Sequence, residues 1–270
     1  MQRGCSKVVH GVRMFLIDDD LFLRTVSFGG GPATVVALNG WSASWEAWQP
    51  TFELLSADVR CISYDTRGCG ASRCLADNVT IDHLVDDVFR VLDAHQVDQC
   101  VLAGESLGGF VAMHAVVRDP SRFTSLVTVS APPAVPSAHP LSAAARADYP
   151  ATVRSFARQC FAGDDSFAHD VDALQAWGAS LFLAADPEVA ARLFEVCADA
   201  PLDPASIAVP TIVVHGEADA VVPVGAAHHL ASTIPGARLV VLPGASHAPT
   251  VTRAAELAEL LRGVTGAAPA

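Results

Sequence analysis

A serine in a glycine-rich stretch is the residue best suited to chemistry in this 270-residue chain. Gly104, Ser106 and Gly108 form the pattern Gly-x-Ser-x-Gly within AGESLGGF, after a strand-like apolar run and before a helical stretch. A tight strand-to-helix turn strains the backbone, admits only small neighbours and lifts the serine hydroxyl clear of the sheet. Inert glycine-rich turns carry the same pattern, but this context predicts that Ser106 is a nucleophile. Glu105 should point away from it and support the turn.

A serine hydroxyl needs a base to take its proton and a third group to orient that base. Asp219 and His247 each follow a predicted strand, at the edge where sites in parallel sheets form. The chain order Ser106, Asp219, His247 predicts a triad with His247 as general base and Asp219 as its orienting acid. Glu217 is the rival acid, disfavoured because the loop must first reach the imidazole. His215 ends a strand and is interpreted as a packed residue.

The negative charge that develops on a substrate carbonyl oxygen requires backbone N–H donors. One donor is expected from Leu107, the residue after the nucleophile, and the other from Trp41 in the loop after the strand 34–38. Trp41 also belongs to a group with Trp45 and Trp48 that an ordinary aromatic cluster would explain. The two interpretations are compatible, because the proposed donor is the backbone N–H of Trp41 and the aromatic cluster involves its side chain.

Eight apolar or alternating runs predict strands, and helical periods separate most of them. This alternation indicates an α/β fold with a mostly parallel eight-stranded sheet and helices on both faces. The predicted strands are 14–17, 21–27, 34–38, 59–64, 100–103, 123–129, 211–215 and 238–242.

Residues 134–206 lack strand signals and instead contain amphipathic, alanine-rich windows. The segment is too long for a bare loop, so it predicts a helical cap inserted into a core formed by residues 1–133 and 207–270. Phe161, Trp177 and Phe182 in this insert are candidates for an apolar substrate pocket. They would serve equally well to attach the cap to the core.

Composition and motifs restrict the classes of partner. With a net charge of −12, the chain has no electrostatic attraction for nucleic acid or an anionic membrane. It has no His-Glu-x-x-His, carboxylate cluster, phosphate loop or dinucleotide fingerprint, so neither a metal nor a cofactor is expected. The expected partner is a small-molecule substrate.

The cysteines and the apolar runs bear on location. Seven cysteines, an odd number without a Cys-x-x-Cys, favour reduced thiols; Cys69 and Cys74, which flank a turn, are the one pair considered for a disulfide. The first twenty residues have no apolar run typical of a signal peptide, and no stretch of about 18 apolar residues predicts a membrane span. A cytoplasmic location is therefore expected.

From about Val12 to Leu261 the chain resembles the α/β-hydrolase superfamily. It looks most like the lid-bearing subgroup of small esterases, enol-lactonases, carbon–carbon bond hydrolases and cofactor-free haloperoxidases. Asn39 departs from the histidine that family members often carry there, which puts the hydrogen bonding of the oxyanion loop in question. The resemblance rests on LNGWSASWEAW, SYDTRGCGAS, AGESLGGF, PTIVVHGEADAVVP and LPGASHAP.

The leading hypothesis is hydrolysis of a carboxylic ester or lactone of a small, largely apolar substrate through an acyl-enzyme. Acyl transfer, peracid formation and carbon–carbon cleavage would use the same serine and stay open. A non-catalytic binding protein on the same fold is the alternative from another class, since a fold alone does not settle function. Such a binding protein would be expected to lack one of the three triad residues.

Overall fold

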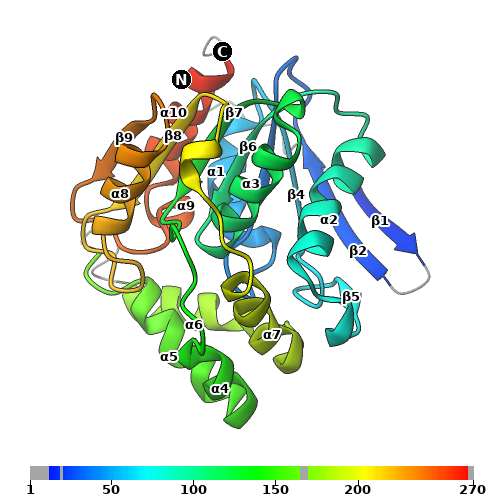
Figure 1. The fold of residues 1–270 in the computed structure, drawn as a ribbon. Coiled ribbons are helices and arrows are strands. Elements are labelled where there is room, and N and C mark those ends of the chain that lie inside the picture. The colour runs from blue at the N-terminus through cyan, green and yellow to red at the C-terminus, as the bar shows by residue number, and fades with distance from the viewer. Residues whose placement is uncertain (1–11, 19–20, 165–169, 267–270) are drawn as a thin grey trace, which may run out of the picture.

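The computed structural model describes residues 12–18, 21–164 and 170–266. Its centre is one sheet with helices on both sides, and a separate group of helices lies beyond one end of the strands (Figure 1). The strand order is β1-β2-β4-β3-β6-β7-β8-β9, with the short β5 paired to β2. The strands are β1 Val12–Asp18, β2 Leu21–Phe28, β3 Thr34–Leu38, β4 Arg60–Tyr64, β5 Arg73–Cys74, β6 Cys100–Glu105, β7 Phe123–Val129, β8 Thr211–Gly216 and β9 Arg238–Leu242.

The predicted mostly parallel sheet is confirmed. The strands β1, β2 and β4 pair antiparallel, and every pair from β4 through β3 to β9 is parallel. All eight predicted strands are present, and the two-residue β5 is a ninth that its sequence did not signal. Because the parallel strands share one direction, the residues that follow β3, β6, β8 and β9 meet at one edge.

Two hydrophobic clusters cover the two faces of the sheet. Along β3 the side chains alternate between them: Val36 and Leu38 join one cluster, and Val35 and Ala37 join the other. The helices of the core are α1 Gln49–Leu55, α2 Ile81–Ala94, α3 Leu107–Arg118, α8 Gly225–Thr233, α9 Pro249–Thr252 and α10 Ala254–Thr265. Strands buried on both faces explain the continuous apolar runs in the sequence.

Between β7 and β8, where the helical insert is predicted, the described residues form four α-helices, which appear green to olive below the sheet in Figure 1. Backbone and indole hydrogen bonds join them to the core: Trp41 Nε1 donates to Ala190 O at 2.7 Å, and Asp186 N donates to Gly68 O at 2.8 Å. The cap boundaries at residues 134 and 206 stay a prediction. The helices are α4 Pro140–Ala147, α5 Tyr149–Cys160, α6 Val171–Phe182 and α7 Pro187–Ala198.

The stretch 45–55 forms a 3₁₀ turn, Trp45–Trp48, followed by α1. Cys69 and Cys74 are free thiols, in agreement with the reduced cysteines that the sequence favoured. Within the described ranges, no helix is both long and apolar enough to cross a membrane.

Candidate active site

Ser106 lies between β6 and α3, at the strand-to-helix turn that its motif predicts. Its backbone has φ 52° and ψ −121°, a conformation that non-glycine residues rarely adopt. Its N–H donates to Val129 O of β7 at 2.8 Å, and its carbonyl accepts from Gly109 N and Phe110 N at the start of α3. The turn is therefore held on both sides, which lets the strained conformation persist.

The glycines around Ser106 are required by close backbone contacts. A Cβ on Gly104 would lie 2.5 Å from Gly108 O, and a Cβ on Gly108 would lie 2.4 Å from Asn39 O. Real Cβ atoms do not approach backbone oxygens this closely. The glycines thus allow the turn to pack against the end of β3, which brings the loop after β3 beside Ser106.

Replacing Gly108 with alanine is expected to lower the free energy of unfolding by about 3 kcal/mol, since backbone must move to admit the methyl group. Gly263, which is exposed on α10, is the matched control, because a Cβ there meets nothing within 4 Å. Its alanine variant should gain up to about 1 kcal/mol through helix propensity. Thermal unfolding of both variants tests the contrast, and equal effects would contradict this account of the turn.

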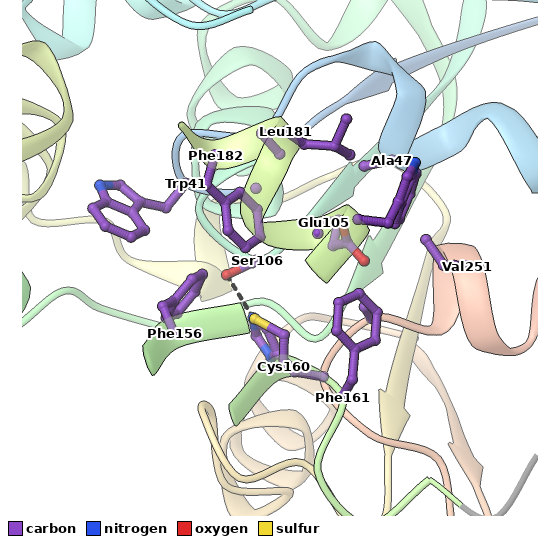
Figure 2. A pocket seen from close by; sticks show the side chains of 16 residues that line it. Trp41, Ala47, Glu105, Ser106, Phe156, Cys160, Phe161, Leu181, Phe182 and Val251 are labelled. Atoms are coloured by element: carbon purple, nitrogen blue, oxygen red, sulfur yellow. Dashed lines mark hydrogen bonds between the residues drawn. The ribbon is translucent and has the colours of Figure 1, made fainter. Parts of the chain in front are cut away.

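The structure brings Ser106, Asp219 and His247 together, although 141 positions separate Ser106 from His247. His247 Nε2 lies 3.0 Å from Ser106 Oγ, and His247 Nδ1 lies 2.7 Å from Asp219 Oδ2. The dashed line in Figure 2 marks the bond at the Ser106 hydroxyl. Asp219 follows β8 and His247 follows β9, so the shared edge of the sheet positions both.

Asp219 is held by four donors. Its Oδ1 accepts from Val221 N at 2.8 Å and Val222 N at 2.9 Å, and its Oδ2 accepts from His247 and, at 3.1 Å, from His215. Burial by itself raises the pKa of Asp219, but the hydrogen bonds from both histidines outweigh it and hold this pKa well below its usual value. Asp219 is therefore a carboxylate at neutral pH.

Glu217, the rival acid, is exposed and accepts a hydrogen bond from Gly244 N at 3.1 Å. His215 is fully buried as expected, but its contact with Asp219 could not be read from the sequence. His215 Nε2 lies near two acceptors, the Asp219 carboxylate and Val222 O, the latter at 2.8 Å. Because neither acceptor can donate, the nitrogen between them carries the proton. His215 thus acts as a further donor to Asp219.

Trp41 and Leu107 both line the cavity at Ser106, on the loop after β3 and at the first residue of α3. Their role as oxyanion donors stays a prediction. Asn39, which replaces the histidine common in the family, bonds to a neighbouring strand. Its Nδ2 donates to Tyr64 O at 2.6 Å, which ties the end of β3 to the end of β4. The Asn39 Oδ1 atom is buried without a partner among the described residues.

Two cavities meet at Ser106. The smaller has a volume of about 30 Å³ and the larger about 280 Å³. Trp41, Ser106 and Phe156 line both, and the Trp41 and Phe156 rings contact each other edge to face with centroids 5.0 Å apart. This ring pair therefore divides the space above Ser106. His247 lines only the smaller cavity, and Leu107 lines only the larger.

Phe161, Trp177 and Phe182, the predicted pocket residues of the insert, all line the smaller cavity. Figure 2 shows Phe182 next to Ser106, with Phe161 on the opposite side from Trp41. Together with Trp41 and Phe156, these three side chains give the smaller cavity a wall with many aromatic rings. That the three residues bind substrate stays a prediction.

Glu105 lines the smaller cavity (Figure 2). Its carboxyl is bound to Thr250 of α9, whose hydroxyl donates to Glu105 Oε1 at 2.6 Å. This bond agrees with the expected supporting role, whereas the position of Glu105 in the cavity wall was not expected. Burial raises the pKa of Glu105 to about 7, although the bond from Thr250 and the nearby His247 act in the opposite direction. No feature of the sequence around Glu105 signals this long-range contact.

Within the described ranges, no group of three or more His, Cys, Asp or Glu side chains is arranged to hold a metal ion. At Ser106 a hydroxyl, an imidazole and a buried carboxylate stand in hydrogen-bonded order. This order is the arrangement that activates a serine nucleophile.

A parallel sheet with a strained serine turn and this hydrogen-bonded order defines a serine hydrolase class of site. The model of the Alpha/beta hydrolase family matches residues 35–260, and the chain belongs to that family. It is an enzyme family of hydrolases, in agreement with the resemblance in the sequence.

Curated relatives align over most of their length. The chain is 29% identical over 257 residues to the pimeloyl-[acyl-carrier protein] methyl ester esterase of Aeromonas hydrophila, covering 88% of this chain and 97% of that protein. It is 32% identical over 246 residues to the putative carbamate hydrolase RutD of Variovorax paradoxus, covering 83% and 90%.

Solved structures share the fold. An enol-lactonase from Burkholderia xenovorans LB400 superposes with a TM-score of 0.85 at 24% identity, covering 93% of this chain and 99% of that one. A bromoperoxidase from Bacillus anthracis gives a TM-score of 0.85 at 20% identity, covering 94% and 99%. At these identities the likeness shows the fold alone.

Proposed function

We propose that this protein hydrolyses a carboxylic ester through an acyl-enzyme on Ser106. The observation that carries the proposal is the hydrogen-bonded order Ser106–His247–Asp219, with distances of 3.0 and 2.7 Å, facing two apolar cavities. The match to the Alpha/beta hydrolase family and the named esterases among the relatives support it.

In the proposed mechanism, His247 Nε2 takes the proton of the Ser106 hydroxyl as its oxygen attacks the ester carbonyl. The N–H groups of Trp41 and Leu107 are the proposed donors to the resulting oxyanion. His247 then gives its proton to the alcohol oxygen, which leaves. Water, deprotonated by His247, attacks the acyl group and frees the acid. Asp219 stabilises the imidazolium in both steps.

We infer from the two cavities how the two halves of the ester are bound. The leaving alcohol must lie within reach of His247, and His247 lines only the small cavity of about 30 Å³. The acyl group therefore occupies the cavity of about 280 Å³, whose wall includes Pro132, Leu141 and Phe194. We infer a substrate with a small alcohol and a longer apolar acyl group. The relative named as a methyl ester esterase supports a small alcohol.

The ring pair of Trp41 and Phe156 favours an open-chain ester over a lactone. In an open ester the two halves diverge from the carbonyl and fit on the two sides of this ring pair. In a lactone they are joined in one ring and must enter together. A lactone is thus the second candidate. Acyl transfer, peracid formation and carbon–carbon cleavage would use the same serine, and no feature of the cavities favours them.

Replacing Phe156 with alanine is expected to merge the two cavities and relax selection of the alcohol. The wild-type protein should cleave methyl hexanoate at least tenfold better, in kcat/KM, than benzyl hexanoate, as is usual for size selection in an apolar pocket. In the variant this ratio should fall at least tenfold.

The matched control for this change is Phe194→Ala. Phe194 also packs on Trp41, with ring centroids 5.3 Å apart, but it lines only the larger cavity. Its variant should keep the methyl-to-benzyl ratio and lose rate with long acyl chains. If Phe194→Ala changes the alcohol ratio and Phe156→Ala does not, the assignment of the two halves is reversed.

We further propose a small-molecule substrate as the partner and a cytoplasmic location. The described cysteines support the location, because each is an unpaired thiol. They are Cys61, Cys69, Cys74, Cys100, Cys160 and Cys197.

A further inference from the structure

Glu105 is a carboxyl group in a cavity that otherwise has aromatic and aliphatic walls. Of the residues that line the small cavity, only Glu105, His247 and Cys160 carry titratable side chains, and none is lysine or arginine. Glu105 itself is only 6% exposed. A negative charge that enters this cavity would therefore meet a carboxylate without a neighbouring lysine or arginine in the wall.

The Glu105 carboxyl is fixed in place. It accepts from the Thr250 hydroxyl at 2.6 Å and also interacts with the Thr250 backbone N–H. Thr250 is itself anchored, since its carbonyl accepts from Thr51 Oγ1 of α1 at 2.7 Å. These bonds join Glu105 to Thr250 and not to Ser106, so Glu105 is not part of the hydrogen-bonded triad. It lines the same cavity as Ser106 and His247.

Three titratable groups face Glu105: His247 and Asp219 from the loops after β9 and β8, and Cys160 from α5. Burial raises the pKa of Glu105 to about 7, Asp219 adds to this, and Thr250 and His247 oppose it. Above this pH Glu105 is mainly a carboxylate, and below it mainly a neutral acid. In a cavity with little water, repulsion between two like charges is weakly screened.

We propose that Glu105 determines the charge specificity of the small cavity, admitting uncharged alcohol groups of the ester and rejecting anionic ones. The inference rests on the proposed function, which places the leaving alcohol in this cavity. It concerns the alcohol half alone, because Glu105 does not line the larger cavity. Glu105 is thus a specificity-determining residue and takes no proton in the reaction.

Two esters of one acid and of nearly equal size test the proposal: carbamoylmethyl hexanoate, which is neutral, and carboxymethyl hexanoate, which is anionic. At pH 8.5 the wild-type protein should favour the neutral ester about 100-fold in kcat/KM. Glu105→Gln preserves shape and can still accept from Thr250, so it should reduce this preference at least tenfold. An unchanged preference in Glu105→Gln overturns the proposal.

The wild-type protein supplies a second measurement that needs no variant. The ratio of kcat/KM for the two esters cancels any pH dependence that both reactions share. The carboxymethyl ester stays ionised between pH 5.5 and 9. The preference for the neutral ester should therefore be greatest well above pH 7, shrink through pH 7 and be smallest well below it, where Glu105 is mainly protonated. A ratio that does not change with pH contradicts the proposal.

The outcomes separate this inference from the function on which it rests. If the neutral ester is cleaved and the anionic ester is cleaved equally well, only the role of Glu105 fails. If Ser106→Ala cleaves the neutral ester as fast as the wild-type protein, the proposed function fails and the inference falls with it.

Discussion

Replacing Ser106 with alanine is expected to lower kcat/KM for p-nitrophenyl butyrate by about a million-fold. The alanine leaves His247, 3.0 Å from the Ser106 oxygen in the wild-type protein, without a nucleophile to activate. Only direct attack of water on the ester, assisted by the remaining donors of the site, would then persist. Initial rates of p-nitrophenol release measure the loss, and the thermal unfolding midpoint verifies that the variant is folded.

Ser130 provides the matched control for this change. It also follows a buried parallel strand and has a positive φ of 50°, but its hydroxyl has no hydrogen-bond partner among the described residues. Ser130→Ala should keep the wild-type rate within about threefold, since it removes no group of the triad. Retained activity in Ser106→Ala would refute the role of Ser106 as nucleophile.

A fluorophosphonate probe separates an enzyme from a binding protein on the same fold. It should label the wild-type protein at Ser106 and leave Ser106→Ala unlabelled, because only an activated serine attacks the phosphorus. Absence of labelling in the folded wild-type protein would favour a ligand-binding role.

Replacing Asp219 with asparagine is expected to reduce kcat about 10⁴-fold. Asparagine keeps the size of the side chain but removes the charge that stabilises the His247 imidazolium. Its amide can also present N–H to Nδ1 and so favour the wrong tautomer of the imidazole. The affinity for substrate should change little, because Asp219 lines neither of the two cavities at Ser106. Steady-state kinetics with a short ester separate kcat from KM.

Glu217→Gln is the control that discriminates the two acids. Glu217 is exposed and its carboxylate accepts a hydrogen bond from Gly244 N, outside the triad, so its variant should retain the wild-type kcat within about twofold. The double variant of Ser106→Ala and Asp219→Asn should be no slower than Ser106→Ala, because triad residues act as a unit. A large loss in Glu217→Gln with a small loss in Asp219→Asn would reverse the assignment.

The sequence alone determined the elements and the main chemistry. Apolar runs predicted eight strands because strands buried on both faces contain continuous apolar residues, and β3 and β6 have this composition. The turn at Ser106 was predictable because its two glycines and its place between strand and helix are local features. The short β5 was not, since two residues carry no periodicity.

The tertiary structure decided which side chains meet. Asp219 and Glu217 are two residues apart and look alike in the sequence, and only the path of the loop after β8 directs one of them to His247. The inward position of Glu105 depends on Thr250, 145 residues away, and the contact of His215 with Asp219 depends on that same loop. The two cavities likewise arise from rings on the core and the cap, Trp41 and Phe156. Sequence patterns report backbone preferences over a few residues, whereas these contacts depend on packing between distant segments.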